Sequence, residues 1–151
     1  MTTPPELQPF DQMPPIRTPS DMYRHWQALM GPLGFSEHLL WVGFITPDGL
    51  MTPPLSQIDG LPVEPDLPTL EAMMGAFREL VEEIGPGATV ALLVSRPGSA
   101  RMTRSDKAWA RGLSHAAARA DVPLQPIHLA TDEDLRVFAV DDLLPEARAA
   151  R

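Results

Sequence analysis

The chain has 151 residues, a hydrophobic content of 44% and a formal net charge of −8, which suits one globular domain that buries its own core. It contains no cysteine, which excludes disulfides, thiolate nucleophiles and cysteine-bound zinc or iron–sulfur centres. No apolar run approaches the roughly 20 residues of a membrane span, and the first residues do not resemble a signal peptide. We therefore expect a cytoplasmic protein with no membrane partner.

The charges are divided unevenly along the chain. Residues 1–87 hold three basic and twelve acidic side chains, whereas residues 88–151 hold nine basic and eight acidic ones. Five of the nine basic residues lie in and just after one central loop: Arg96, Arg101, Arg104, Lys107 and Arg111. The acidic total argues against nucleic-acid binding, while the basic group suits a small anion or an oppositely charged partner.

The first element expected is a helix that follows a Pro-rich arm. Residues 1–19 carry six prolines and no periodicity, which predicts an arm ahead of a single domain over residues 20–143. Ser20 is a suitable N-cap, and Asp21 favours the first helical turn. Apolar residues then recur at helical spacing up to the glycines that end the helix: Met22, Trp26, Leu29, Met30 and Leu33.

A hairpin and a second helix are expected next. The apolar run over residues 38–45 predicts a strand buried on both faces. A turn at residues 47–49 leads into residues 50–58, whose two prolines predict an edge or bulged strand. After a Pro-rich connector over residues 59–68, the clearest apolar periodicity predicts a helix over residues 70–84 with an acidic outer face.

The second half is organised around residues 88–94, which predict a strand buried on both faces. A loop rich in Gly, Pro and Arg follows, and a helix is expected from Thr103 to Ala120. Residues 122–130 are expected to form a strand interrupted by prolines, and residues 135–140 a closing strand, ahead of a tail over residues 144–151. This order predicts an α/β (α+β) domain of three layers, in which helices flank a mixed sheet.

From Trp41 onward, this order and spacing resemble the JAB/JAMM (MPN) domain, especially its RadC-like bacterial branch. The matching motifs are Val94-Ser95-Arg96-Pro97, aligned with the family's His-x-His-Pro, and the Ser-x-x-Asp-like start of the next helix at Thr103–Asp106. In that family two histidines and the aspartate bind zinc, and an upstream glutamate handles the proton of the attacking water. A second pattern, Leu33-Gly-Phe followed by a Trp41-Val-Gly strand, resembles actinobacterial proteins of unknown function.

The departures from the metal motif argue against zinc chemistry. Val94 has no donor atom, and Arg96 carries a permanent positive charge that repels a cation. Asp106 by itself cannot hold a catalytic zinc, which needs about three protein ligands. The resemblance therefore implies a JAB-like fold without metal or another cofactor and without the family's hydrolytic mechanism.

Three interpretations of the loop remain open. Arg96 can pair with Asp106 as a structural ion pair in place of the metal. Alternatively, Arg96, Arg101 and Arg104 at the helix start can bind a small anion or nucleotide. A hydrolase that uses Ser95 or Asp106 with a histidine is the third interpretation.

The sequence thus favours a non-catalytic interaction or scaffold domain. We expect a protein partner or a homodimer, bound through the basic residues of the loop and the following helix. No residue is assigned as catalytic or as a metal ligand.

Overall fold

A computed structural model describes residues 14–143 and shows a mixed α and β domain built on one five-stranded sheet. The strand order is β2-β1-β3-β4-β5, with β1 at Leu39–Ile45, β2 at Met51–Ile58, β3 at Thr89–Ser95, β4 at His128–Ala130 and β5 at Leu135–Val137. Strands β3 and β4 run parallel, and the other neighbouring pairs are antiparallel. The expected order of helices and strands and the mixed sheet are confirmed.

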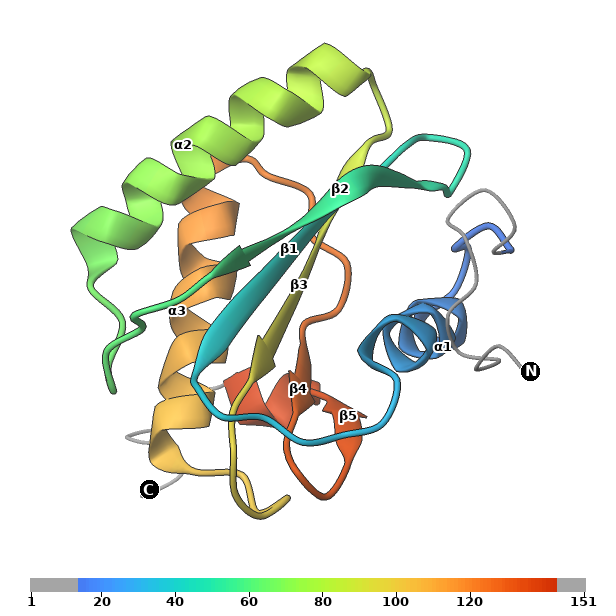
Figure 1. Cartoon of the computed structure of the whole chain (residues 1–151). Helices are drawn as coiled ribbons and strands as arrows, with labels where there is room; N and C mark the ends of the chain where they lie inside the picture. Colours follow the sequence, from blue (N-terminus) through green and yellow to red (C-terminus); the bar gives the residue numbers. More distant parts are fainter. Residues whose placement is uncertain (1–13, 144–151) are drawn as a thin grey trace.

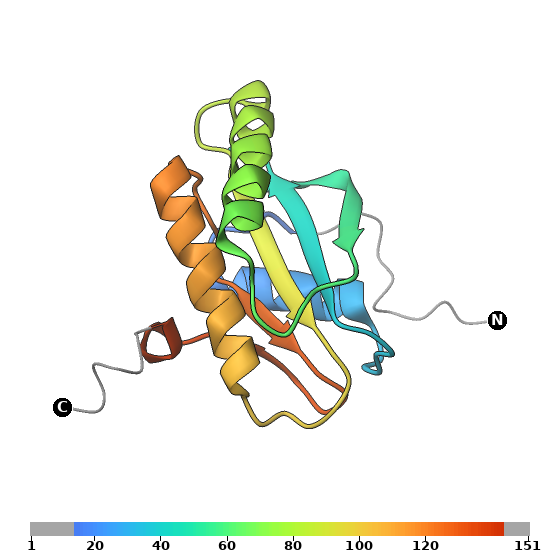
Figure 2. The same cartoon turned by 90° about the vertical axis from the view of Figure 1, so that its left-hand side faces the viewer.

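The helices lie on both faces of the sheet. Helices α2 (Leu67–Ile84) and α3 (Arg104–Ala120) cover one face, and α1 (Pro19–Met30) covers the other (Figures 1 and 2). Two buried apolar clusters match this division, one between the sheet and α2 with α3, and one between the sheet and α1. The three-layer arrangement predicted from the sequence is therefore present.

Helix α1 begins earlier than the sequence suggests. Thr18, and not Ser20, is the N-cap: its hydroxyl accepts from Asp21 N–H at 3.1 Å, and the Asp21 carboxylate accepts from Thr18 N–H at 3.0 Å. This reciprocal capping box places Pro19 in the first turn, where its missing N–H costs nothing. Ile16 just upstream is 5% exposed and donates its N–H to Gly49 O at 2.7 Å, so the chain is packed against the sheet before the helix begins.

Strand β2 is an edge strand with an irregular register, as its prolines predict. The pairing with β1 shifts between Val42 and Phe44. Gly43 lies at this shift, and a Cβ there would meet the Met51 side chain at 2.9 Å. Glycine is common at bulges, and a side chain at this position would require the end of the Met51 side chain to move.

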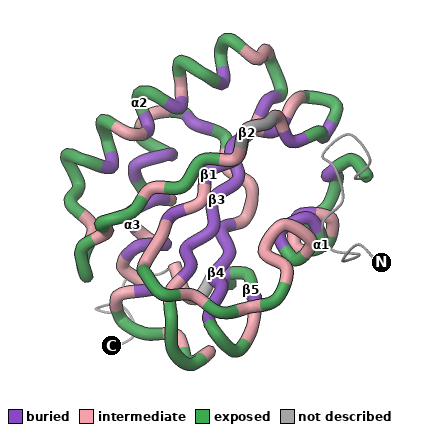
Figure 3. Tube along the Cα trace, viewed as in Figure 1, coloured by how far each residue is buried: buried purple, intermediate pink, exposed green. Residues whose placement is uncertain are grey.

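Strand β3 is the centre of the molecule. Every residue from Val90 to Ser95 is buried (Figure 3), and side chains of β3 contribute to both apolar clusters. Val94, Leu92 and Val90 pack under α2 and α3, while Ala91 and Leu93 pack under α1. The expected burial on both faces is confirmed.

Of two predictions for the C-terminal part, one is confirmed and one is corrected. Residues 122–130 form a strand interrupted by prolines, as expected: Leu124 forms an isolated bridge with Val90, and the regular pairing with β3 begins at β4. Pro123 and Pro126 have no N–H to donate, so a regular ladder cannot run through them. The closing strand stops at Val137 and not at residue 140, and a 3-10 helix follows over Val140–Leu143.

The structure describes only part of the expected arm and none of the expected tail. Residues 1–13 of the expected arm and residues 144–151 of the expected tail lie outside the described residues. Within residues 14–143, no helix combines the length and the apolar character needed to cross a membrane.

Candidate functional site

The candidate site lies where the parallel strands β3 and β4 end and α3 begins. Thr103 is the N-cap of α3: its hydroxyl accepts from Asp106 N–H at 3.0 Å, and the Asp106 carboxylate accepts from Thr103 N–H at 2.8 Å. The carboxyl ends of parallel strands next to a helix N-terminus are a common place for ligand sites. The loop over residues 96–103 covers this position.

Arg96 and Asp106 form a bidentate ion pair, which is the first of the three interpretations of the loop. Arg96 Nε donates to Asp106 Oδ1 at 2.8 Å and Nη2 donates to Oδ2 at 2.7 Å. The two side chains are 15% and 1% exposed, so the pair is largely shielded from water. Two parallel N–H···O bonds to a carboxylate are the strongest geometry available to arginine.

The remaining donors of Arg96 bind the loop that follows it. Nη1 donates to Pro97 O at 3.0 Å and Ser99 O at 3.1 Å, and Nη2 donates to Arg101 O at 2.9 Å. Arginine has five N–H donors, and all five have an acceptor here. A guanidinium satisfied in this way braces a loop and has no donor left for an anion.

The same contacts set the ionisation of the pair. Burial by itself would raise the pKa of Asp106, but the hydrogen bonds from Arg96 and Thr103 outweigh it and hold that pKa below its ordinary value. The bond to Asp106 raises the pKa of Arg96. Asp106 is therefore an anion at neutral pH and cannot donate a proton as a general acid.

A second set of bonds holds the loop from the β4–β5 turn. Asp132 accepts from Gly98 N–H at 2.8 Å and from Phe35 N–H at 2.9 Å, and Glu133 accepts from Ala100 N–H at 2.7 Å. These backbone N–H groups, first that of Gly98 and then that of Phe35, lower the pKa of Asp132. The loop is thus fixed at both ends by buried or backbone-bonded carboxylates.

The serine and the histidines do not form a nucleophile–base pair. Ser95 is fully buried and its hydroxyl accepts from Trp41 Nε1 at 2.8 Å. His128 is also fully buried, and its Nδ1 lies 3.0 Å from Pro126 O. His115 is exposed on the outer side of α3, away from Ser95. A nucleophile must be within hydrogen-bond reach of its base and open to substrate, and neither condition is met at Ser95.

His38 is a neighbour of the ion pair that sequence reasoning missed. Its ring packs edge-on against Trp109, with centroids 5.8 Å apart, and its Nε2 is buried without a partner. Burial lowers the pKa of His38; Asp106 acts in the opposite direction and Arg96 lowers it further. His38 precedes β1 and meets α3 only through the antiparallel β1–β3 pairing, so no local motif signals the contact.

The other basic residues of the expected group do not join Arg96. Arg101 and Arg104 are exposed, and Lys107 and Arg111 are half-buried on α3. Arg96 points inward to Asp106, so the group divides into one buried brace and a set of side chains on the outer surface.

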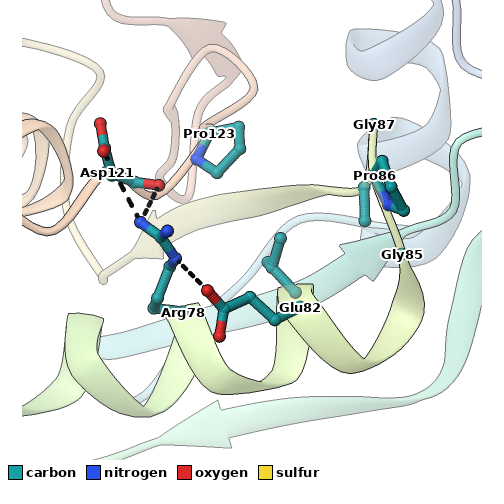
Figure 4. A pocket seen from close by; sticks show the side chains of 9 residues that line it. Arg78, Glu82, Gly85, Pro86, Gly87, Asp121 and Pro123 are labelled. Atoms are coloured by element: carbon teal, nitrogen blue, oxygen red, sulfur yellow. Dashed lines mark hydrogen bonds and ion pairs between the residues drawn. The ribbon is translucent and has the colours of Figure 1, made fainter.

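A second arginine, Arg78 on α2, performs a similar task at the opposite end of α3. Its Nη1 donates to Ala120 O at 2.9 Å. Figure 4 shows its bonds to Asp121 and Glu82, in which Nη1 donates to Asp121 O at 3.1 Å and Nε donates to Glu82 at 2.9 Å. A cation at a helix C-terminus offsets the negative end of the helix dipole. A hollow of about 310 Å³ lies beside it, and Arg78 on the otherwise acidic outer side of α2 is the sequence signal for this contact.

The fold and the cluster together define a three-layer α/β domain with a braced loop at the end of its central strand. No group of three or more His, Asp or Glu side chains among residues 14–143 is arranged to hold a metal ion. Comparisons with known protein families, with curated proteins and with solved structures found no match.

Proposed function

We propose that this chain is a non-catalytic protein-binding domain with a metal-free JAB-like fold, and that its partner is a second copy of the same chain. The supporting observation is the closure of the loop cluster. All five N–H donors of Arg96 are bonded to Asp106 or to loop carbonyls, and Asp106 is 1% exposed. Catalytic and ligand-binding groups have to be open to substrate, whereas this pair is turned into the protein.

The surface outside the cluster carries complementary charges. The acidic residues expected on the outer side of α2 are all exposed: Glu71, Glu79, Glu82 and Glu83. Arg101 is exposed on the braced loop, whose backbone is held in place from both sides. Because the acidic and basic regions occupy different parts of one molecule, two copies can bring opposite charges together.

Apolar side chains lie next to the acidic face. Val63 is 72% exposed and Leu67 is 50% exposed, four positions apart at the start of α2. The connector that carries Val63 is fixed to α3, because Trp109 Nε1 donates to Pro62 O at 3.0 Å and Ser105 donates to Val63 O. A fixed pair of exposed apolar side chains would supply contact area that charges alone do not.

Sedimentation equilibrium of the full chain over a range of salt concentrations tests the proposal. We expect a reversible dimer that weakens as salt rises, because contacts between exposed charges are screened. Arg101→Glu is expected to weaken association by about tenfold, or about 1.4 kcal/mol.

Arg24→Glu makes the same change of charge on α1, on the opposite side of the sheet, and is expected to leave the dimer intact. A chain that stays monomeric up to about 1 mM, where the free energy of association is only about −4 kcal/mol, would contradict the proposal. If Arg101→Glu and Arg24→Glu weaken the dimer equally, the loop is not part of the dimer interface.

A further inference from the structure

A hollow lies at the edge of the sheet beside the C-terminal half of α3. Its volume is about 420 Å³, which falls within the range of about 300–1,000 Å³ that small-molecule sites occupy. Ser114 and Ala118 line it from α3, Leu124 lines it from the segment that leads to β4, and Leu143 lines it from the 3-10 helix. It shares no residue with the loop cluster around Arg96.

The backbone of Leu124 offers a free donor and a free acceptor. Its bridge to β3 is made by its two neighbours: Val90 N–H donates to Pro123 O at 2.9 Å, and Gln125 N–H donates to Val90 O at 2.8 Å. The C=O and N–H of one trans peptide group point in opposite directions, so the N–H and the C=O of Leu124 both point away from β3. Neither group has a hydrogen-bond partner within residues 14–143.

The hollow lies on the side to which these two groups point. Strand β5 pairs with β4 on the edge away from β3, and this pairing ends where Phe138 N–H donates to Ile127 O at 2.9 Å. The chain then turns into the 3-10 helix, which packs against α3, so no described strand continues beside Leu124. Because Phe138 and Leu143 line the same hollow as Leu124, the hollow takes the position that a longer β5 would fill.

The side chains around the hollow are mostly apolar. Val122, Ile127 and Phe138 are buried and form its inner wall, and Leu143 is half-buried at its opening. No charged side chain of the described residues lines it. An ion that entered would lose its hydration without gaining an opposite charge. The hollow is therefore suited to a neutral ligand with a largely apolar surface.

We propose that this hollow binds a small neutral heterocycle whose edge carries an acceptor nitrogen next to an N–H donor. In an antiparallel sheet, one extended residue bonds the residue opposite through both its N–H and its C=O. A ring with this edge makes the same two bonds, because its nitrogen accepts from Leu124 N–H and its N–H donates to Leu124 O. The apolar walls cover the faces of the ring. The volume, near the lower end of the usual range, limits the ligand to one or two fused rings.

Amide NMR of the full chain, titrated with 7-azaindole at neutral pH, tests the site. We expect the Leu124 amide proton to move downfield in a saturable way and to exchange more slowly with water, because it gains an acceptor. Indole has the same shape and N–H but lacks the acceptor nitrogen. It leaves the Leu124 N–H buried and unpaired, so we expect it to bind about tenfold more weakly, a difference of about 1.4 kcal/mol. Absence of a saturable shift at the Leu124 amide, or equal binding of the two probes, would overturn the proposal.

A variant that fills the hollow and a matched control locate the bound ring. Ala118 is exposed on α3 and lines the hollow, so Ala118→Phe places a large side chain in the ligand's space without disturbing the core. We expect it to weaken 7-azaindole binding by about tenfold or more. Ala76→Phe makes the same change at an exposed position of α2 that does not line the hollow, and is expected to keep the affinity within about twofold. Binding by Ala118→Phe as tight as that of the wild type would contradict the assignment.

Discussion

Replacement of Arg96 by methionine tests whether the buried ion pair braces the central loop. The substitution keeps much of the side-chain volume and removes all five donors. It leaves the carboxylate of Asp106 at 1% exposure with Thr103 as its remaining partner. Removing one member of a buried pair costs about 3–5 kcal/mol. Because Arg96 is 15% exposed, water can reach its site, and we expect about 3 kcal/mol.

Urea unfolding followed by tryptophan fluorescence measures this loss. For a chain of this size, about 3 kcal/mol corresponds to a fall in melting temperature of roughly 10 °C. Arg96→Lys keeps the charge and loses the bidentate geometry, so its loss is expected to be intermediate. Arg101→Met, at an exposed position of the same loop, is expected to stay within about 0.5 kcal/mol of the wild type. If Arg96→Met lowers the free energy of unfolding by less than about 1 kcal/mol, the ion pair does not brace the loop.

The ion pair also predicts a dependence on pH. The pKa of Asp106 is lower in the folded chain than its ordinary value, since Arg96 and Thr103 outweigh the effect of burial. Its contribution to stability is therefore complete above the unfolded pKa of about 3.9 and is lost as the pH falls through the lower folded pKa. In Arg96→Met, the free energy of unfolding should fall less over this acid range than it does in the wild type. Parallel pH profiles for wild type and variant would contradict the assignment.

Two pairs of glycine variants test the packing by thermal unfolding. Gly49→Ala is expected to cost about 1–3 kcal/mol more than Gly60→Ala, because both have positive φ but only at Gly49 would a Cβ meet backbone, 2.9 Å from Ile16 O. Equal losses would show that Ile16 is not packed as described. Gly75→Ala on α2 should stabilise the fold by up to about 1 kcal/mol, because alanine favours a helix and the new Cβ would lie in open space. Gly112→Ala on α3 should not show this gain, because its Cβ would lie 3.0 Å from the Leu70 side chain. A gain at Gly112 equal to that at Gly75 would contradict the close approach of α2 and α3.

The elements that local chemistry determines were predictable. The apolar run of β3, the helical period of α2 and the turn at Gly49 each follow from spacing and from residues with special backbone preferences. The start of α1 was misplaced because both Thr18 and Ser20 can cap a helix. The N-cap is the residue whose backbone N–H can bond the Asp21 side chain in return. A capping box requires a spacing of three residues, which Thr18 has and Ser20 does not.

Features that depend on distant parts of the chain were missed. Helix α1 and strand β5 are separated by more than 100 residues in the sequence but pack beside each other in the fold. The side chain of His38 reaches Trp109 through the pairing of β1 with β3, which a search for local motifs does not reveal.

Native mass spectrometry of the full chain, purified without chelator, tests the central proposal most directly because it reports the oligomeric state and any bound metal together. The account predicts a dimer of twice the 16.5 kDa chain mass with no stoichiometric metal ion. A divalent metal bound one per chain, or a monomer at every concentration, would contradict a metal-free domain that binds a second copy of itself.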